Sequence, residues 1–346
     1  MEKYLVTGGC GFCGVEIVKC LLKKGHKVRV IDVEDLPSEL EGLGIDFRKV
    51  DIRDKIRVFE SCEGIDRIIH TVAKVPISKA GKGFIEVNVN GTRNVLEAAL
   101  ECGIKKVVHI STSAVQLVGW NPVDENDPYN PLGPYAKSKL QGEHVCKEFI
   151  KKGLEVDMIR PRTVLGTGRM GIFDMFFDWI YNGSRVYVLG GGHNVIQLLY
   201  SEDLAECCYL SSLKKGSYIF NIGSKSYSSL REDMGSLLDY AGTGSKFLSL
   251  PVDPVIFTLR GLDLMKLSPL APWHYLSFHK DFYFNNKRAK EVLGWEPKLG
   301  NKEVLKVAYD SYIENRGKNV KIDEKYGTSH RKSLKQGVLG FLKWLP

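Results

Sequence analysis

The sequence contains no hydrophobic run of about 20 residues, the length that a membrane-spanning helix requires. Its eight cysteines are scattered without the regular spacing of a disulfide framework, which favours a reducing compartment. A strand-like apolar run begins at residue 3, so we expect no secretory signal before the fold. A chain of 346 residues with these properties predicts a cytoplasmic protein with a sizeable core.

Excess positive charge is scarce outside the C-terminal end. The formal net charge is +8, and residues 316–346 hold eight Lys and Arg against two acidic residues. The remainder is nearly neutral and lacks the basic surface typical of nucleic-acid binding, so we expect no nucleic-acid partner. In residues 331–345, apolar side chains share one helical stripe flanked by lysines and Trp344. Such a tail lies peripherally on the inner face of a membrane, or it covers an apolar groove on the protein or a dimer partner; both interpretations stay open.

The first 32 residues follow the plan of a dinucleotide-binding βαβ unit. A short apolar run ends in glycines spaced G-x-x-G-x-x-G, a helical pattern follows, and a second β-rich run ends at Asp32. A pyrophosphate lies against N–H groups at the helix N-terminus, so no Cβ is tolerated at Gly8, Gly11 or Gly14. The Asp32 carboxylate can accept hydrogen bonds from the adenosine ribose, and no arginine follows to neutralise a 2′-phosphate. The sequence therefore predicts NAD rather than NADP.

Two cysteines of this loop, Cys10 and Cys13, form a C-x-x-C pattern. Further metal ligands are missing from the neighbouring sequence, and small side chains suit a glycine loop in any case. We interpret both cysteines as loop residues rather than as a redox or metal site, and we expect no metal.

Strand and helix patterns alternate up to residue 165, which predicts an α/β fold of the Rossmann type with a doubly wound parallel sheet. Shorter elements follow over 166–315, where we expect a smaller substrate-binding lobe. Residues 195–224 are expected to return to the first domain, and 316–346 form the basic tail. The aromatic run 272–278 either covers a substrate or belongs to the core, and we favour the core.

Ser111, Thr112 and Ser113 follow a strand predicted over 106–110, at the sheet edge where ligands bind, and the helix that bears Tyr135 and Lys139 begins at the same edge. Tyr135 and Lys139 are four residues apart and hence share one helix face. A nearby ammonium lowers the pKa of a phenol from about 10, which makes Tyr135 a candidate general acid and base. A serine or threonine of 111–113 can polarise the same substrate oxygen.

Several further motifs occur in a fixed order within 1–315: 51–54 (DIRD), 70–73 (HTVA), 88–92 (NVNGT), 160–166 (RPRTVLG), 201–205 (SEDLA), 220–224 (FNIGS) and 293–297 (LGWEP). With the glycine loop and the Tyr135–Lys139 pair, they make the chain similar to extended short-chain dehydrogenases/reductases. That family includes NAD-dependent nucleotide-sugar epimerases, dehydratases and 3β-hydroxysteroid dehydrogenases. The resemblance implies a Rossmann fold, bound NAD and a homodimer formed through paired helices.

The resemblance also implies a set of site residues. The catalytic residues are Tyr135, Lys139 and one hydroxyl, for which we prefer Ser113 over Thr112. The cofactor-binding residues are Gly8, Gly9, Cys10, Gly11, Phe12, Cys13, Gly14, Asp32, Asp51, Ile52, His70, Thr71, Val72, Ala73, Asn88, Ser111, Tyr135, Lys139, Pro161, Thr163 and Val164. Within this set we interpret His70 as a core histidine beside the cofactor and Asn88 as a residue that fixes a loop.

Other polar side chains are candidate partners of a nucleotide diphosphate. We select Arg162, Arg169, Gln197 and Arg231 as substrate residues, with Arg160 and His193 as further candidates.

The reaction is less well defined by the sequence. Related sugar dehydratases carry Asp-Glu after the active threonine, and this chain has Ala114-Val115 after Ser113, which argues against a dehydratase. We favour a nucleotide-sugar epimerase or ketoreductase. A dehydrogenase of a steroid or other lipid alcohol comes second, and a binding protein without turnover comes third.

Overall fold

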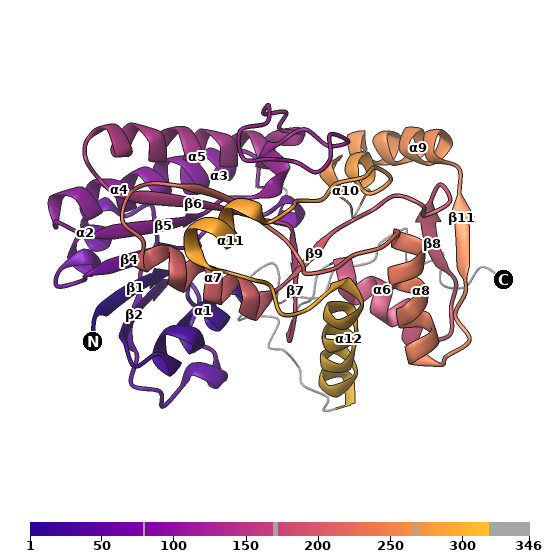
Figure 1. Ribbon diagram of the computed structural model, residues 1–346, viewed down its shortest axis with the longest axis horizontal. Helices are drawn as coiled ribbons and strands as arrows, with labels where there is room; N and C mark the ends of the chain where they lie inside the picture. The colour runs from indigo at the N-terminus through magenta and orange to yellow at the C-terminus, as the bar shows by residue number, and fades with distance from the viewer. Residues whose placement is uncertain (79, 169–171, 266–267, 269, 271, 318–346) are drawn as a thin grey trace.

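The computed structural model describes residues 1–78, 80–168, 172–265, 268, 270 and 272–317. The amphipathic stripe predicted over 331–345 lies outside the described residues. Figure 1 shows a sheet flanked by helices on one side of the molecule and a smaller group of helices and short strands on the other. In the described part of the chain, none of the helices is both long and apolar enough to cross a lipid bilayer.

A seven-stranded parallel sheet has the order β10-β6-β5-β4-β1-β2-β3 (Figure 1). The strands are β1 (Lys3–Thr7), β2 (Lys27–Asp32), β3 (Asp46–Lys49), β4 (Arg67–His70), β5 (Lys106–Ile110), β6 (Val156–Pro161) and β10 (Ile219–Ile222). The strand order reverses between β1 and β4, where α/β sheets of this kind bind ligands. The predicted α/β, Rossmann-type doubly wound fold is confirmed.

Helices cover both faces of this sheet. One face carries α1 (Phe12–Lys23), α7 (Ser201–Leu213) and α11 (Lys287–Leu293). The other carries α2 (Lys55–Cys62), α4 (Thr92–Glu101) and α5 (Gly133–Lys151). Each face has its own buried apolar cluster, because a parallel sheet covered on both sides exposes neither face to water.

The remaining elements form a lobe with a third apolar cluster. Its helices are α6 (Ile172–Tyr181), α8 (Leu230–Ala241), α9 (Val252–Leu264), α10 (Pro272–Ser277) and α12 (Asn301–Gly317). Its strands pair in parallel: β7 (Thr163–Leu165) with β9 (Leu198–Tyr200), and β8 (Val186–Leu189) with β11 (Phe247–Leu250). The exact domain boundaries, including residue 165, stay a prediction.

The structure departs from the sequence-based expectation in two places. The apolar residues of 84–100 recur at helical spacing and predict a single helix, but the structure divides this stretch into α3 (Gly83–Ile85), a π-helical segment (Glu86–Gly91) and α4. The π-helical segment ends at Gly91, where the helix packs closely on Ile52: a Cβ there would lie 2.6 Å from Ile52 Cγ2. The short strands β7, β8, β9 and β11 were also not expected, because their partners come from distant parts of the chain. Three short 3₁₀ segments complete the elements: Ser38–Leu40, Pro76–Ser78 and Ser113–Val115.

Candidate active site

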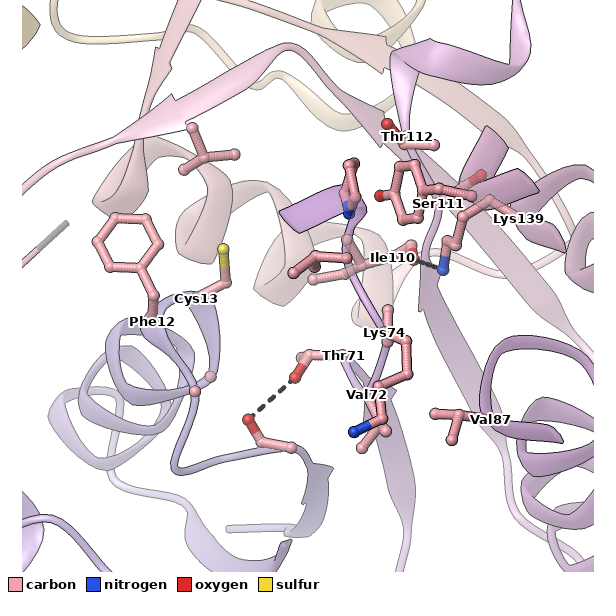
Figure 2. A pocket seen from close by; sticks show the side chains of 18 of the residues that line it. Phe12, Cys13, Thr71, Val72, Lys74, Val87, Ile110, Ser111, Thr112 and Lys139 are labelled. Atoms are coloured by element: carbon pink, nitrogen blue, oxygen red, sulfur yellow. Dashed lines mark hydrogen bonds between the residues drawn. The ribbon is translucent and has the colours of Figure 1, made fainter. Parts of the chain in front are cut away.

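A cavity of about 710 Å³ opens at the carboxyl ends of the sheet strands. Residues that follow β1, β2, β3, β4, β5 and β6 line it, together with residues of α5, α6 and α10. Figure 2 shows Phe12 and Cys13 on one side of this space and Ser111, Thr112 and Lys139 on the other. The cavity therefore spans from the glycine loop to the helix that bears Tyr135 and Lys139.

The glycine loop leaves room for a ligand because its backbone is packed too closely for side chains. Gly8 has a φ of +74°, and a Cβ there would lie 2.7 Å from Thr71 Oγ1. A Cβ on Gly14 would lie 2.1 Å from the Gly8 carbonyl oxygen. Gly11 precedes the first turn of α1, so the positive end of the helix faces the cavity. This wall fits a pyrophosphate.

Asp32 lies at the end of β2 and lines the cavity. Its carboxylate accepts hydrogen bonds from the backbone N–H groups of Cys10 (3.0 Å) and Glu34 (3.1 Å). Burial raises the pKa of this carboxyl, and the two N–H groups partly offset the effect. Each oxygen keeps a lone pair for a ribose hydroxyl, so the acid fits the adenosine end of NAD.

Most of the predicted cofactor residues line the cavity: Gly8, Gly11, Phe12, Cys13, Gly14, Asp32, Asp51, Ile52, Thr71, Val72, Ala73, Ser111, Tyr135, Lys139, Pro161, Thr163 and Val164. Four others, Gly9, Cys10, His70 and Asn88, lie behind this surface. Gly9 packs against Val30, and Cys10 acts through its backbone N–H on Asp32.

His70 and Asn88 hold the cavity wall from behind. His70 is buried, with Nδ1 2.6 Å from Thr7 Oγ1 and Nε2 3.0 Å from Thr92 Oγ1. Burial lowers the pKa of His70 to about 3, so the ring is neutral. Asn88 accepts from the Lys74 backbone N–H (2.7 Å) and donates to the Lys74 carbonyl (3.0 Å), which fixes the loop after β4.

Tyr135 and Lys139 of α5 both line the cavity. Lys139 is 1% exposed and its Nζ donates to the Ile110 carbonyl at 2.7 Å, as Figure 2 shows. The same Nζ lies 3.4 Å from His109 Nε2. Burial lowers the pKa of Lys139 to about 8. The ammonium is thus held in a dry position with a pKa close to neutral pH.

The two candidate hydroxyls have different surroundings. Thr112 lines the cavity, and its Oγ1 accepts from the Ala114 backbone N–H at 3.2 Å. Ser113 is buried just behind the lining residues, and its Oγ accepts from Arg162 Nη1 at 3.0 Å. Ser111, the first of the three, donates to Glu143 Oε1 at 2.6 Å and supports the turn from below.

The candidate substrate residues are dispersed. Arg162 lines the cavity, whereas Arg169 lies outside the described residues. Gln197 is buried in the core, where its side chain bonds to the backbone of Ser224 and Phe284. Arg231 lies away from the cavity, with its Nε bonded to the Gly191 carbonyl.

The further candidates Arg160 and His193 also lie away from the cavity lining. Arg160 is buried and forms an ion pair with Glu143, and His193 is exposed on the surface.

The aromatic run 272–278 reaches the cavity after all. Trp273, His274 and Phe278 line it, opposite Ile172 and Phe173 of α6. The run therefore both lines the cavity and meets the core, because Trp273 also packs against the buried Phe282. No sequence pattern predicts this placement, because an apolar helix face has the same pattern whether it contacts the core or a ligand.

The model of one protein family matches residues 4–223, and its description is the NAD dependent epimerase/dehydratase family. The chain belongs to this family. The predicted membership of the extended short-chain dehydrogenases/reductases is confirmed, and the cofactor is NAD.

Individual members of the epimerase/dehydratase family are similar over most of the chain. An uncharacterized protein of Sinorhizobium fredii is 36% identical over 98% of this chain and 85% of its own length. A UDP-glucuronate 4-epimerase of Thermodesulfobacterium geofontis is 28% identical over 91% of this chain and 97% of its own. The crystal structure of a UDP-glucose 4-epimerase from Thermotoga maritima has a TM-score of 0.77 at 22% identity, covering 91% of this chain and 99% of that one. This last likeness shows the shared fold.

Proposed function

We propose that the protein is an NAD-dependent oxidoreductase that acts at a secondary alcohol of a nucleotide sugar, as a 4-epimerase or ketoreductase. One observation carries the proposal: Tyr135, Lys139 and the hydroxyl-bearing turn 111–113 meet the glycine loop in a single cavity. The UDP-sugar epimerases among its relatives support a nucleotide sugar as substrate.

In the proposed reaction, the Tyr135 phenolate takes the proton of the substrate hydroxyl as the alcohol becomes a ketone. The Lys139 ammonium, fixed by the Ile110 carbonyl, favours the phenolate by its charge. A hydroxyl of Ser113 or Thr112 donates a hydrogen bond to the same substrate oxygen. When bound, NAD supplies the acceptor for the hydride that leaves the adjacent carbon.

The first test incubates the purified protein with NAD and UDP-glucose or UDP-glucuronate. An epimerase interconverts the sugars without net NADH, whereas a dehydrogenase accumulates NADH absorbance at 340 nm. Absence of both signals with every sugar nucleotide would remove this proposal.

Tyr135→Phe tests the proposed acid and base directly. We expect turnover to fall about 10³-fold, because positioned proton transfer contributes roughly 10² to 10⁴. NAD affinity, measured by titration, should stay within about twofold. Full activity of this variant would exclude Tyr135 from the mechanism. Thr112→Val and Ser113→Ala, compared in the same assay, identify the hydroxyl.

A lipid or steroid alcohol is the second candidate substrate. The aromatic wall formed by Trp273, His274 and Phe278 favours it, since flat rings cover apolar surface well. Net NADH with a 3β-hydroxysteroid, and none with sugar nucleotides, would place this candidate first. A non-catalytic NAD-binding role is the third candidate, and bound NAD without turnover of either class would support it.

We further propose a cytoplasmic homodimer whose basic tail contacts a membrane surface or an apolar groove. The pattern of residues 331–345 supports both forms of contact. Liposome flotation of the full chain and of a chain truncated after Asn315 separates them. Equal flotation excludes the membrane role, and analytical ultracentrifugation of the same pair reports whether the tail supports the dimer.

A further inference from the structure

Two buried arginines lie two residues apart and have opposite electrostatic surroundings. Arg160 is fully buried and forms a bidentate pair with Glu143, at 2.8 Å (Nε to Oε1) and 2.7 Å (Nη2 to Oε2). Arg162 is 4% exposed, and among the described residues no carboxylate forms an ion pair with it. Its Nε has no hydrogen-bond partner among the described groups either. Burial without a counter-charge lowers the pKa of Arg162 to about 9.

The Arg162 guanidinium is fixed in the cavity wall. Its Cζ lies over the Phe282 ring, 3.9 Å from the centroid, and 5.7 Å from the centroid of Phe284. Its Nη1 donates to Ser113 Oγ at 3.0 Å. Stacking and this single bond hold the group in place, but a neutral hydroxyl and two rings do not neutralise its charge.

A buried cation without a partner destabilises the free protein, so its placement in a ligand cavity indicates an anionic group on the ligand. A planar guanidinium matches a carboxylate with two parallel hydrogen bonds. A dianionic phosphate fits this wall less well, because one cation and two apolar rings leave its second charge uncompensated.

The position of Arg162 defines where that carboxylate lies on the substrate. In the proposed function, Ser113 or Thr112 polarises the reacting oxygen. Arg162 donates a hydrogen bond to Ser113. An anionic group bound by Arg162 would therefore lie beside these hydroxyls, close to the reacting carbon. The diphosphate of a nucleotide sugar, at C1, is across the ring from C4 and does not meet this requirement.

We propose that Arg162 binds a substrate carboxylate and that the substrate is a β-hydroxy acid, with the carboxylate on the carbon adjacent to the reacting alcohol. The proposal rests on the oxidoreductase function proposed above and narrows its substrate class. Two sources supply this chemistry: the hexuronate of a nucleotide sugar, and a lipid with a 3-hydroxy acid group.

The test uses substrate pairs that differ only in this group. UDP-glucuronate and UDP-glucose form the first pair, and a 3β-hydroxysteroid with and without a 4-carboxylate forms the second. We expect kcat/KM of the NAD-loaded protein to favour the carboxylate member of one pair by about 100-fold, the size of a charge-assisted bidentate contact. The pair that shows this preference identifies the source.

Three variants link the preference to Arg162. Arg162→Met keeps the packing on Phe282 and should reduce the preference to within about threefold of unity. Arg162→Lys keeps the charge without the bidentate geometry and should give an intermediate ratio. Arg185→Met removes an exposed arginine of the same lobe and should keep the wild-type ratio.

Several outcomes would overturn the proposal. Equal turnover of both members by the wild-type protein would do so without any variant. An equal fall for both members in Arg162→Met would mean that Arg162 acts on the shared reacting oxygen. A loss of NAD affinity in that variant, with the ratio kept, would assign Arg162 to the cofactor.

A binding measurement separates this proposal from the proposed function. The rise in Tm of NAD-loaded protein is compared for the two members of each pair at equal concentration. A larger rise in Tm with the carboxylate member supports the proposal if the difference disappears in Arg162→Met. This result stands even if none of the four compounds is turned over and the proposed function fails. Equal rises overturn the proposal.

Discussion

The cofactor side and the substrate side of the cavity are built in different ways. Most of the cofactor side comes from the first 73 residues, which present backbone N–H groups, glycine and the acidic residues Asp32, Glu34 and Asp51. The substrate side is assembled from Arg162, Ile172, Phe173 and α10, which are far apart in the sequence. On the first side, backbone N–H groups donate hydrogen bonds to the Asp32 carboxylate. The second side holds the Arg162 guanidinium against aromatic rings, with no carboxylate partner among the described residues. A shared cofactor can thus be recognised by local structure, while substrate choice depends on tertiary contacts.

The largest effect is expected from breaking the paired arginine. Arg160→Met leaves Glu143 buried without its partner and should lower the free energy of unfolding by about 3–5 kcal/mol, measured by urea titration. Arg162→Met is the matched comparison, because it removes a charge that has no carboxylate partner in the described structure. It should leave the free energy of unfolding unchanged or raise it by up to about 4 kcal/mol, because it removes a charge that destabilises the free protein. Equal losses of unfolding free energy in the two variants would contradict the difference in pairing between Arg160 and Arg162.

The next effect tests the close packing of the cofactor side. In Gly14→Ala the new Cβ meets the Gly8 backbone oxygen at 2.1 Å, which no side-chain rotation can relieve. We expect a loss of about 3 kcal/mol in unfolding free energy and a large loss of NAD affinity by titration. Gly261→Ala in α9 is the control, since a Cβ there meets no atom within 4 Å. It should be neutral or stabilise the protein by up to about 1 kcal/mol.

A smaller effect is expected at Lys139, where the two sides meet. Its folded pKa of about 8 lies below the value of 10.5 for an exposed lysine, so the unfolded chain binds more protons between these two pH values. The contribution of Lys139 to the stability of the NAD-free protein, taken as wild type minus Lys139→Met, should therefore rise with pH from 8 to 10.5, by up to about 3 kcal/mol. Urea titrations of both proteins over this pH range measure the difference. A rise of equal size in the variant would assign it to other groups.

The βαβ unit and the motif order were predictable because each depends on local chemistry. A strand that must be buried on both faces reads as a continuous apolar run, and the loop after β1 has room only for glycine at Gly8 and Gly14. The π-helical segment was not predicted, since the apolar spacing of residues 84–100 is the same for an α-helix with a π-helical turn and for one without it. The short strands of the second lobe were not predicted because their partners come from distant parts of the chain.

The sequence by itself determined the Rossmann sheet, the family, NAD as cofactor and the identity of Tyr135 and Lys139 as neighbours on one helix face. Only the tertiary structure decided which arginine is paired, that Gln197 lies in the core, and that Trp273 faces a cavity. The physical reason is the separation in sequence over which each interaction acts. Helix and strand periodicity and glycine conformation act over a few residues, whereas the partner of a buried charge can come from any segment that tertiary folding brings close.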